Sequence, residues 1–424
     1  MTAFLRQRAA ILSFLALAMV FWRVNRDAHR GYFSGDDLAT LTWAPGGDTG
    51  EWLKLLVTPV FNSSNFRPVG AFYYKWLGMK YWLRFRAYSI ALQWFHVINV
   101  ALLLVWLRRL QLPLPASLAS CCWFAFSALL LPAFWKPMYI FDVLCCLFCL
   151  VTLLLYDRGH WILGLFSMWL AYRAKEVAVM LPLALTAYEF LLGAGRWKRL
   201  IPYYAISLNF GVQALLYKAP ETVYTLHFTP PALLTSTVFY GAALLSGPAV
   251  ILLALAVPQA ARDRRFWWGL VSGVCLLAPM LALPGRLFAV YWYVPMIGMT
   301  VAAAALAAQA PRWTLAIGLA VWMAVNYAQV RDAGQALLKE EEEARQYAKD
   351  VESYARQNPG RKVILYDGTP EGIKSWGLES LVQFDWKSNT PKVRPAAEHQ
   401  TDVEPGTGLL RWNSEQHELV IVSK

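Results

Sequence analysis

Residues 139–156 read YIFDVLCCLFCLVTLLLY, an apolar run in which Asp142 is the one charged residue. A helix needs roughly 20 apolar residues to cross a bilayer, so this run is typical of a transmembrane helix. Similar runs recur along the chain and predict a polytopic α-helical membrane protein with about 11 transmembrane helices. The predicted spans are roughly 9–22, 88–106, 116–133, 139–156, 161–173, 177–193, 200–217, 232–257, 267–283, 287–309 and 313–330.

The overall composition supports this fold class. Hydrophobic residues make up 58% of the 424 residues and charged residues 16%, against about a quarter charged in a typical globular domain. A soluble enzyme, a coiled coil and a disordered scaffold are therefore excluded for the whole chain. The net charge of +12 combines +15 from residues 1–330 (26 Lys/Arg, 11 Asp/Glu) with −3 from residues 331–424 (13 and 16). The basic residues lie in short loops between apolar runs, so we attribute them to membrane topology and expect no nucleic acid partner.

The positions of Lys and Arg predict the orientation, because cytoplasmic loops carry an excess of both. With the N-terminus in the cytoplasm, the predicted cytoplasmic loops after residue 87 carry ten of these residues and the opposite loops five. An odd number of spans then places the C-terminal segment outside. The first run could be a cleaved signal peptide, but Phe21-Trp22-Arg23 is a poor cleavage site, and we interpret the run as a retained anchor.

Two regions are not predicted to cross the membrane. Residues 23–87 form a predicted external loop, in which Asp48 precedes Glu51 by three residues, as at a helix start. Two segments of this loop, around 48–60 and Val69–Phe85, are rich in aromatic and cationic residues and predict amphipathic helices in the membrane surface. Residues 331–424 predict a small soluble α/β domain outside the membrane, which follows the transmembrane module of residues 1–330. Its expected elements are a charged helix over Arg331–Gln357 and strands over Lys362–Tyr366 and Leu419–Val422.

In a chain this poor in charge, ionisable residues beside apolar runs are the informative ones. Asp36-Asp37 follows the first span on the predicted outer face. One of these carboxylates could act as a general base on an acceptor hydroxyl. The pair could instead hold a divalent cation, or cap a helix in a solvated loop.

Arg173, Lys175 and Glu176 interrupt two apolar runs at the same predicted face. A cation here could hold a lipid-linked phosphate, with Glu176 orienting it, or the charges could form an ion pair within a helix hairpin. Arg286 ends another span and could be a second phosphate ligand or an interfacial arginine that reaches for water.

Arg67-Pro68 precedes a predicted helix, and Pro68 could fix the direction of the cation. His96 and Asn99 lie three residues apart on the second span, so they share a face, where packing and hydrogen bonding are the common roles. Asp142 lies near a span end and could be interfacial. No phosphate-binding loop, metalloprotease motif or nucleophile elbow is present, and the six cysteines lie inside apolar runs without metal-site spacing.

Several stretches in the same order resemble the GT-C superfamily of membrane glycosyltransferases, and most of all the transmembrane and tetratricopeptide-repeat O-mannosyltransferases and their bacterial relatives. The resemblance covers about residues 1–330. The matching stretches are Gly35-Asp36-Asp37, Phe66-Arg67-Pro68-Val69, His96-Val97-Ile98-Asn99-Val100, Ala174–Leu183, Ala187-Tyr188-Glu189-Phe190 and Tyr291-Trp292-Tyr293-Val294-Pro295.

This resemblance implies an inverting transferase that moves a monosaccharide from a polyprenyl-phosphate carrier to an acceptor hydroxyl on the non-cytoplasmic face. It implies Asp36 as the catalytic base or a neighbour of the base, and our hypothesis is that Asp36 is the base with Asp37 supporting it. Lys175, Arg286 and Arg67 would then bind the donor phosphate. Supporting roles would fall to Glu176, His96, Asn99, Arg173 and Asp142.

The chain departs from the family in two places. Tetratricopeptide repeats are absent, and Tyr139-Ile140-Phe141-Asp142 keeps only the acid of a Gly-Arg-Ala-Asp/Glu pattern. Both departures leave the acceptor open among protein, lipid and polysaccharide. We expect no cofactor, with a divalent metal left open, and a location in a bacterial inner membrane. A transporter or flippase of lipid-linked sugars and a non-catalytic envelope assembly factor are the alternatives.

Overall fold

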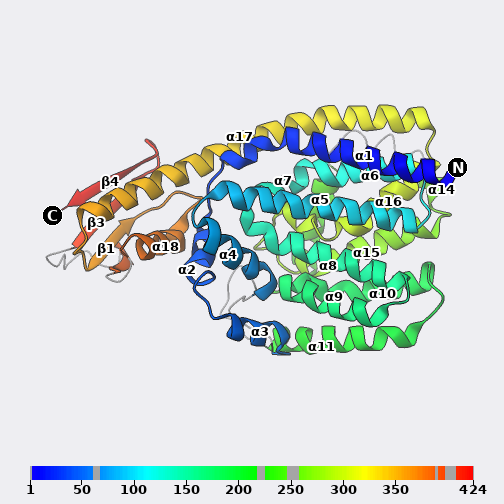
Figure 1. The fold of residues 1–424 in the computed structure, drawn as a ribbon, viewed down its shortest axis with the longest axis horizontal. Helices are drawn as coiled ribbons and strands as arrows, with labels where there is room; N and C mark the ends of the chain where they lie inside the picture. The colour runs from blue at the N-terminus through cyan, green and yellow to red at the C-terminus, as the bar shows by residue number, and fades with distance from the viewer. Residues whose placement is uncertain are drawn as a thin grey trace.

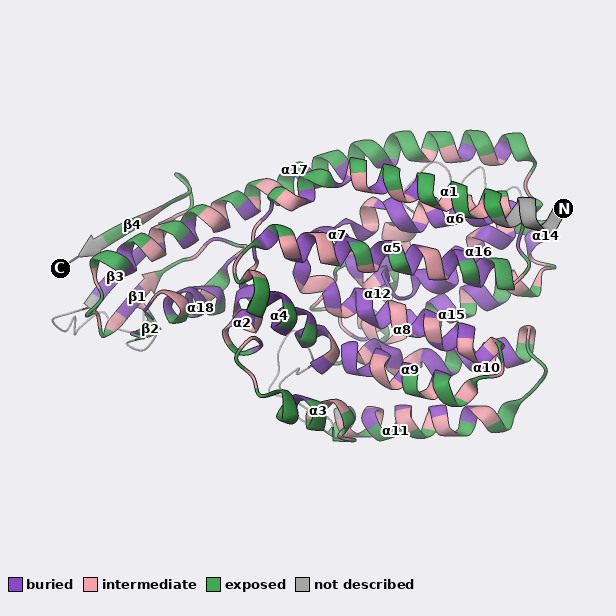
Figure 2. Ribbon diagram, viewed as in Figure 1, coloured by how far each residue is buried: buried purple, intermediate pink, exposed green. Residues whose placement is uncertain are grey.

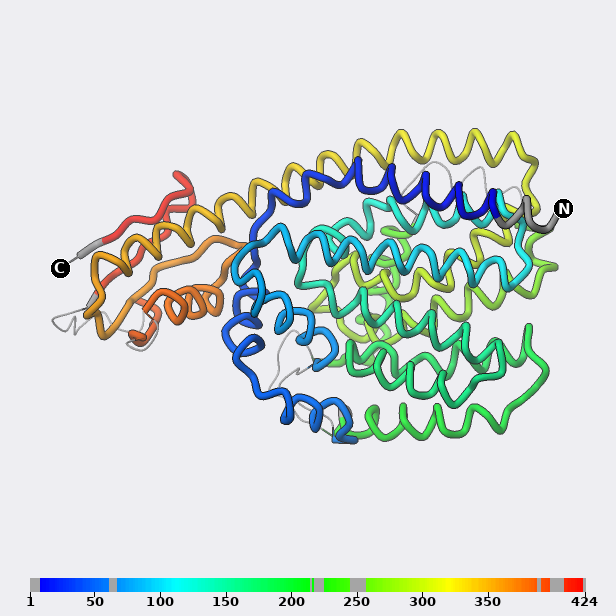
Figure 3. The backbone as a smooth tube through the Cα atoms, in the orientation of Figure 1, coloured from blue at the N-terminus to red at the C-terminus, as the bar shows by residue number. Residues whose placement is uncertain are grey.

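The computed structural model describes residues 2–60, 67–216, 225–245, 257–386, 390–396 and 407–423. The protein is mostly helical, at 76%, with a small C-terminal sheet domain. Figure 1 and Figure 3 show an elongated bundle of helices with the sheet domain at one end and the N-terminus at the other. The predicted fold class is confirmed at this coarse level.

Helices cover the predicted apolar runs as far as those runs are described, although the second half of 232–257 lies outside the described residues. The bundle elements are α1 (Thr2–Val24), α5 (Phe85–Arg109), α6 (Leu114–Phe126), η2 (Ala128–Leu130), α7 (Leu131–Trp135), η3 (Pro137–Tyr139), α8 (Ile140–Asp157), α9 (Trp161–Ala174), η4 (Glu176–Met180), α10 (Leu181–Leu191), η5 (Trp197–Leu200), α11 (Ile201–Leu216), α12 (Pro230–Leu245), α14 (Val257–Ala260), α15 (Arg264–Leu281), η6 (Ala289–Trp292), α16 (Met296–Gln309) and α17 (Arg312–Gln357).

Length and apolar composition together identify fewer spans than the sequence predicts. Among the described helices, three are long and apolar enough to cross a membrane, namely α5, Pro137–Asp157 and α17. A fourth results if α6 is joined to Ala128–Trp135 across a bend of 43°. The other runs fold into shorter or less apolar helices, so the count of about 11 stays a prediction.

At the bend between α6 and η2, some backbone groups lack a hydrogen-bond partner within a helix, so other parts of the protein must supply one. Asn326 of α17 supplies both partners. Its side-chain oxygen accepts from the amide of Ala128 at 2.8 Å, and its side-chain nitrogen donates to the carbonyl of Phe126 at 2.7 Å. One buried asparagine thus fixes α17 against a broken span.

The helix α17 continues without interruption past residue 330, where the apolar run ends. Its first half exposes large apolar side chains such as Trp313 and Ile317, as the outer face in Figure 2 shows. Its second half carries charged residues and packs on the sheet domain. The proposed boundary between the two domains therefore falls inside a single helix of 46 residues.

Residues 23–87, the predicted external loop, contain η1 (Arg26–Arg30), α2 (Gly35–Trp43), α3 (Thr49–Val57) and α4 (Pro68–Tyr81). Asp48 caps α3 by accepting from the amide of Glu51 at 2.8 Å, as the sequence predicts. In contrast, α4 is no simple surface helix, because it buries Tyr73 and Tyr74. Gly70 makes this possible, since a Cβ there would lie 2.1 Å from the ring of Phe141.

The C-terminal domain contains β1 (Val363–Asp367), α18 (Lys374–Trp386), β2 (Lys392–Pro395), β3 (Thr407–Asn413) and β4 (Glu418–Ser423). The strand order is β2-β1-β3-β4, with β1 parallel to both neighbours and β3 antiparallel to β4. The two strands that the sequence predicts correspond to β1 and β4. The charged half of α17 packs on the sheet, where the Tyr347 ring lies 5.6 Å from that of Trp412 in β3, and α18 packs on α17 and α2.

We expect Asn326→Ala to lower the free energy of unfolding by about 3 kcal/mol, because two buried backbone groups lose their partners. The measurement is thermal unfolding in detergent, followed by tryptophan fluorescence. Asn209→Ala is the matched control, since Asn209 donates to the carbonyl of Pro59 at an exposed position. Equal shifts for the two variants would contradict the role given to Asn326.

Candidate functional site

Charged residues from distant parts of the chain meet at the end of the bundle that faces the sheet domain. Arg67 precedes Pro68, the first residue of α4, and Glu176 opens η4. Their side chains form two parallel hydrogen bonds of 2.9 Å. This two-point geometry is the strongest form of an arginine–carboxylate pair.

A second pair lies beside the first. Lys175 donates to both carboxylate oxygens of Asp142, at 2.6 and 2.7 Å. The two side chains are only 11% and 5% exposed, so each charge stays in this apolar region because the other neutralises it. Asp142 is placed by the first turn of α8, and Lys175 by the break between α9 and η4.

Tyr291 of η6 contacts both Lys175 and Arg286, the third predicted cation. The ammonium of Lys175 lies 4.8 Å from the centre of the Tyr291 ring, and the guanidinium of Arg286 donates to its hydroxyl at 2.6 Å. Arg67 also interacts electrostatically with Asp142 and Tyr291. We call Arg67, Asp142, Lys175, Glu176, Arg286 and Tyr291 the cation cluster.

Three cations and two carboxylates make up the charged part of the cation cluster, so opposite charges lie side by side. Burial alone would raise the pKa of Glu176, but the charge and hydrogen bonds of Arg67 outweigh burial and lower that pKa. Glu176 is therefore ionised, and its pairing with Arg67 holds the guanidinium in place. Guanidinium and ammonium groups that are held in this way suit an anionic ligand such as a phosphate.

Asp37 turns inward at the start of α2. Ser34 caps this helix, and its amide and hydroxyl both donate to one oxygen of Asp37, at 2.8 and 2.6 Å. The hydroxyl of Tyr74 donates to the other oxygen. Burial raises the pKa of Asp37 to about 6, although the hydrogen bonds from Ser34 and Tyr74 oppose the rise. Its geometry is that of a helix-capping carboxylate, which is one of the three roles that the sequence leaves open for Asp36 and Asp37.

Asp36 turns outward and is exposed. One of its oxygens accepts from the indole nitrogen of Trp376, in α18, at 2.9 Å. Ser34, at the start of the same helix, donates to the sulfur of Met138 in η3 at 3.4 Å, and η3 leads into the first turn of α8, where Asp142 lies. The exposed acid is therefore at the same end of the bundle as the cation cluster.

Three predicted residues lie elsewhere. His96 and Asn99 are buried inside the bundle, where both contact the hydroxyl of Tyr293, at 2.7 and 3.2 Å. Arg173 donates to the backbone of Thr58, and its guanidinium lies 5.3 Å from the ring centre of Trp169. These residues stabilise packing around the site and do not join the cation cluster.

Ser34, Tyr74, Tyr291 and Trp376 have no predicted role. The spacing Ser34-x-x-Asp37 is a helix-start signature, so the sequence contains a signal for Ser34 as the cap residue. Tyr291 lies in a motif that carries the resemblance. The contact of Trp376 had no local signal, because it joins residues 340 positions apart.

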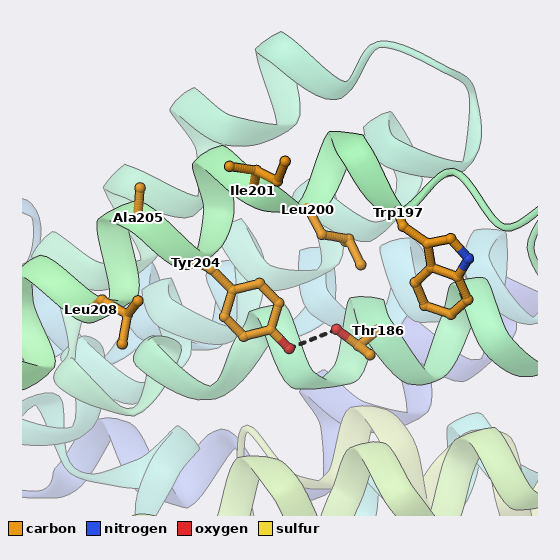
Figure 4. A pocket seen from close by; sticks show the side chains of 7 residues that line it. All are labelled: Thr186, Trp197, Leu200, Ile201, Tyr204, Ala205 and Leu208. Atoms are coloured by element: carbon orange, nitrogen blue, oxygen red, sulfur yellow. Dashed lines mark hydrogen bonds between the residues drawn. The ribbon is translucent and has the colours of Figure 1, made fainter.

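A cavity of about 450 Å³ lies at the opposite end of the bundle, where α10 and α11 approach each other (Figure 4). Its lining is apolar apart from the hydroxyl groups of Thr186 and Tyr204, which form a hydrogen bond of 2.7 Å. No residue of the cation cluster lines it. Within the described part of the chain, no three His, Cys, Asp or Glu side chains gather as a metal site would require.

Comparisons with known proteins return no match: no family model, no curated protein and no solved structure corresponds to the chain.

The raised pKa of Asp37 predicts a pH-dependent stability. The neutral acid is favoured in the folded state, so its contribution is present below the ordinary pKa near 3.8 and is lost as the pH rises through about 6. The full effect is about 3 kcal/mol. We expect thermal unfolding measured between pH 4 and 7.5 to show this fall, and Asp37→Asn, which mimics the neutral acid, to reduce it. Part of the slope should remain, because burial also raises the pKa of Asp385 to about 7 and that of Glu341 to about 8. Asp36→Asn is the control and should keep the full slope; a slope in Asp37→Asn equal to that of the wild type would contradict the assignment.

Proposed function

We propose that the chain is an inverting membrane glycosyltransferase. Its donor would be a monosaccharide on a polyprenyl-phosphate carrier, and its acceptor a hydroxyl group at the outer membrane surface. One observation carries the proposal: three fixed cations gather at the same end of an apolar bundle as an exposed carboxylate, Asp36. The residues of this arrangement are those that the resemblance to GT-C enzymes names.

The cation cluster suits a phosphate leaving group. Breaking the bond between the sugar and the phosphate oxygen leaves negative charge on the phosphate, and cations fixed in advance stabilise that charge best. Tyr291 contacts Lys175 with the face of its ring and accepts a hydrogen bond from Arg286 with its hydroxyl. Arg67 is held by Glu176, so the three cations need little rearrangement to receive a phosphate.

Asp36 suits the role of general base. The acceptor hydroxyl would give its proton to Asp36 while its oxygen attacks the anomeric carbon, and the polyprenyl phosphate would leave from the opposite face of the sugar. This single displacement inverts the anomeric configuration. Asp37 would support the reaction by fixing the first turn of α2, through its bonds to Ser34 and Tyr74.

The distribution of charge supports an outward-facing site. The cation cluster and the sheet domain lie at one end of the bundle, and the N-terminus lies at the other (Figure 1). Under the positive-inside rule, we propose that the N-terminus is cytoplasmic and that the sheet domain is outside, in the periplasm if the membrane is a bacterial inner membrane.

We expect Asp36→Asn to lower the transfer rate by at least about 100-fold, because general bases contribute 10²–10⁴-fold. The test compares the protein in lipid nanodiscs with its variants, on a panel of undecaprenyl-phosphate-linked hexoses. The measurement is the release of undecaprenyl phosphate. Asp48→Asn is the matched control, since Asp48 is an acid of the same loop that only caps α3. Mass spectrometry of envelope glycans from a deletion strain names the sugar and the acceptor.

We expect Lys175→Gln and Arg286→Gln to act differently from Asp36→Asn, by raising the donor KM roughly tenfold or more. Full activity of Asp36→Asn, with envelope sugar lost only in the deletion strain, would instead favour a transporter of lipid-linked sugars or a non-catalytic assembly factor.

A further inference from the structure

The sheet domain touches the bundle beside Asp36 through a close approach of two backbones. The amide of Gly35 donates to the carbonyl of Gly372 at 2.8 Å. A Cβ on Gly35 would lie 2.0 Å from the carbonyl oxygen of Ile373, and one on Gly377 would lie 2.8 Å from the Cα of Gly35. Glycine is therefore required on both sides, and the two helices α2 and α18 meet in one closely defined position.

The charged half of α17 holds the other side of the same loop. Arg345 donates to the carbonyl of Gly31 at 2.7 Å and also to that of Arg30. Glu341 lies so close to Gly31 that a Cβ there would meet its carboxylate at 2.2 Å. The segment that leads into Asp36 is thus held between α17 and α18, and both helices belong to the C-terminal part of the chain.

Trp376 makes the direct contact with the acid. Its indole nitrogen donates to Oδ1 of Asp36 at 2.9 Å. The ammonium of Lys374 lies 5.4 Å from the centre of the Trp376 ring, which restrains that ring. Lys374 itself has a φ of 58°, a backbone conformation that is uncommon outside glycine.

We propose that Trp376 is a positioning residue for Asp36, and that docking of the C-terminal domain completes the catalytic site. The indole N–H fixes one carboxylate oxygen, Oδ1, and leaves Oδ2 to take the proton of the acceptor. The docking follows from the contacts alone, whereas its effect on the transfer rate rests on the proposed function. The domain therefore acts on the rate of the reaction.

The test uses two substitutions of Trp376 in the full-length protein in nanodiscs. Trp376→Phe keeps an aromatic ring and removes the N–H donor. Trp376→His retains an N–H donor, because the Nε2 of histidine lies about as far from Cβ as the indole nitrogen does. Trp197→Phe is the matched control, since Trp197 is an exposed tryptophan that lines the distant cavity between α10 and α11 (Figure 4).

Hydrogen–deuterium exchange provides a readout that needs no substrate. We expect the amides of α2 to exchange about tenfold faster in Trp376→Phe than in the wild type or in Trp197→Phe, the effect of one lost hydrogen bond. Trp376→His should restore most of the protection. Unchanged exchange in Trp376→Phe would overturn the docking role.

Turnover of undecaprenyl-phosphate-linked hexose provides the second readout. We expect Trp376→Phe to lower kcat about tenfold with an unchanged donor KM, and Trp376→His to recover part of the loss. A general loss of folding would lower kcat in both variants alike and would not produce this difference between Trp376→Phe and Trp376→His. An unchanged kcat in Trp376→Phe, with Asp36→Asn inactive, would overturn the positioning role and leave the proposed function standing. If Asp36→Asn is fully active, the assignment of the base fails instead, and with it the effect of Trp376 on the rate.

Discussion

The uninterrupted helix α17 is the constraint on which the arrangement depends. Its 46 residues extend about 70 Å at 1.5 Å per residue, from the apolar bundle into the sheet domain. Such a helix bends only gently unless a proline or an inserted group breaks its hydrogen bonds. The position of Asn326 against the broken span therefore also determines where Glu341 and Arg345 reach the external loop, and where α18 meets α2.

Electrostatics in apolar surroundings explains the composition of the cation cluster. A lone charge at the end of an apolar bundle is costly, so Lys175 and Arg67 each fold against a carboxylate. Pairing keeps both cations rigid, and a hydrogen bond to Tyr291 holds Arg286 beside them. An anion can then be attracted without a large conformational change. The same reasoning explains why His96 and Asn99 lie apart from the cation cluster. Both are neutral polar residues, and they pack inside the bundle with Tyr293.

The sequence predicted what depends on local patterns. Apolar runs located the helices, the Asp48-x-x-Glu51 spacing located α3, and two β-rich segments located β1 and β4. Contacts between residues far apart could not be read locally, such as Arg67 with Glu176. The continuity of α17 was also hidden, because the change from apolar to charged residues at position 330 resembles a domain boundary although both halves favour a helix. For α4, the aromatic and cationic composition of a surface helix concealed a buried face.

Asp36 and Asp37 show how neighbouring residues with the same chemistry take different positions. Successive side chains on a helix point about 100° apart, so the two acids at the start of α2 cannot share a direction. The hydrogen bonds from Ser34 fix Asp37 toward the interior. Asp36 must then point outward, where Trp376 meets it. A helix cap that is structural in itself thus decides which of two equivalent carboxylates is available to a ligand, and the C-terminal domain decides how that carboxylate is held.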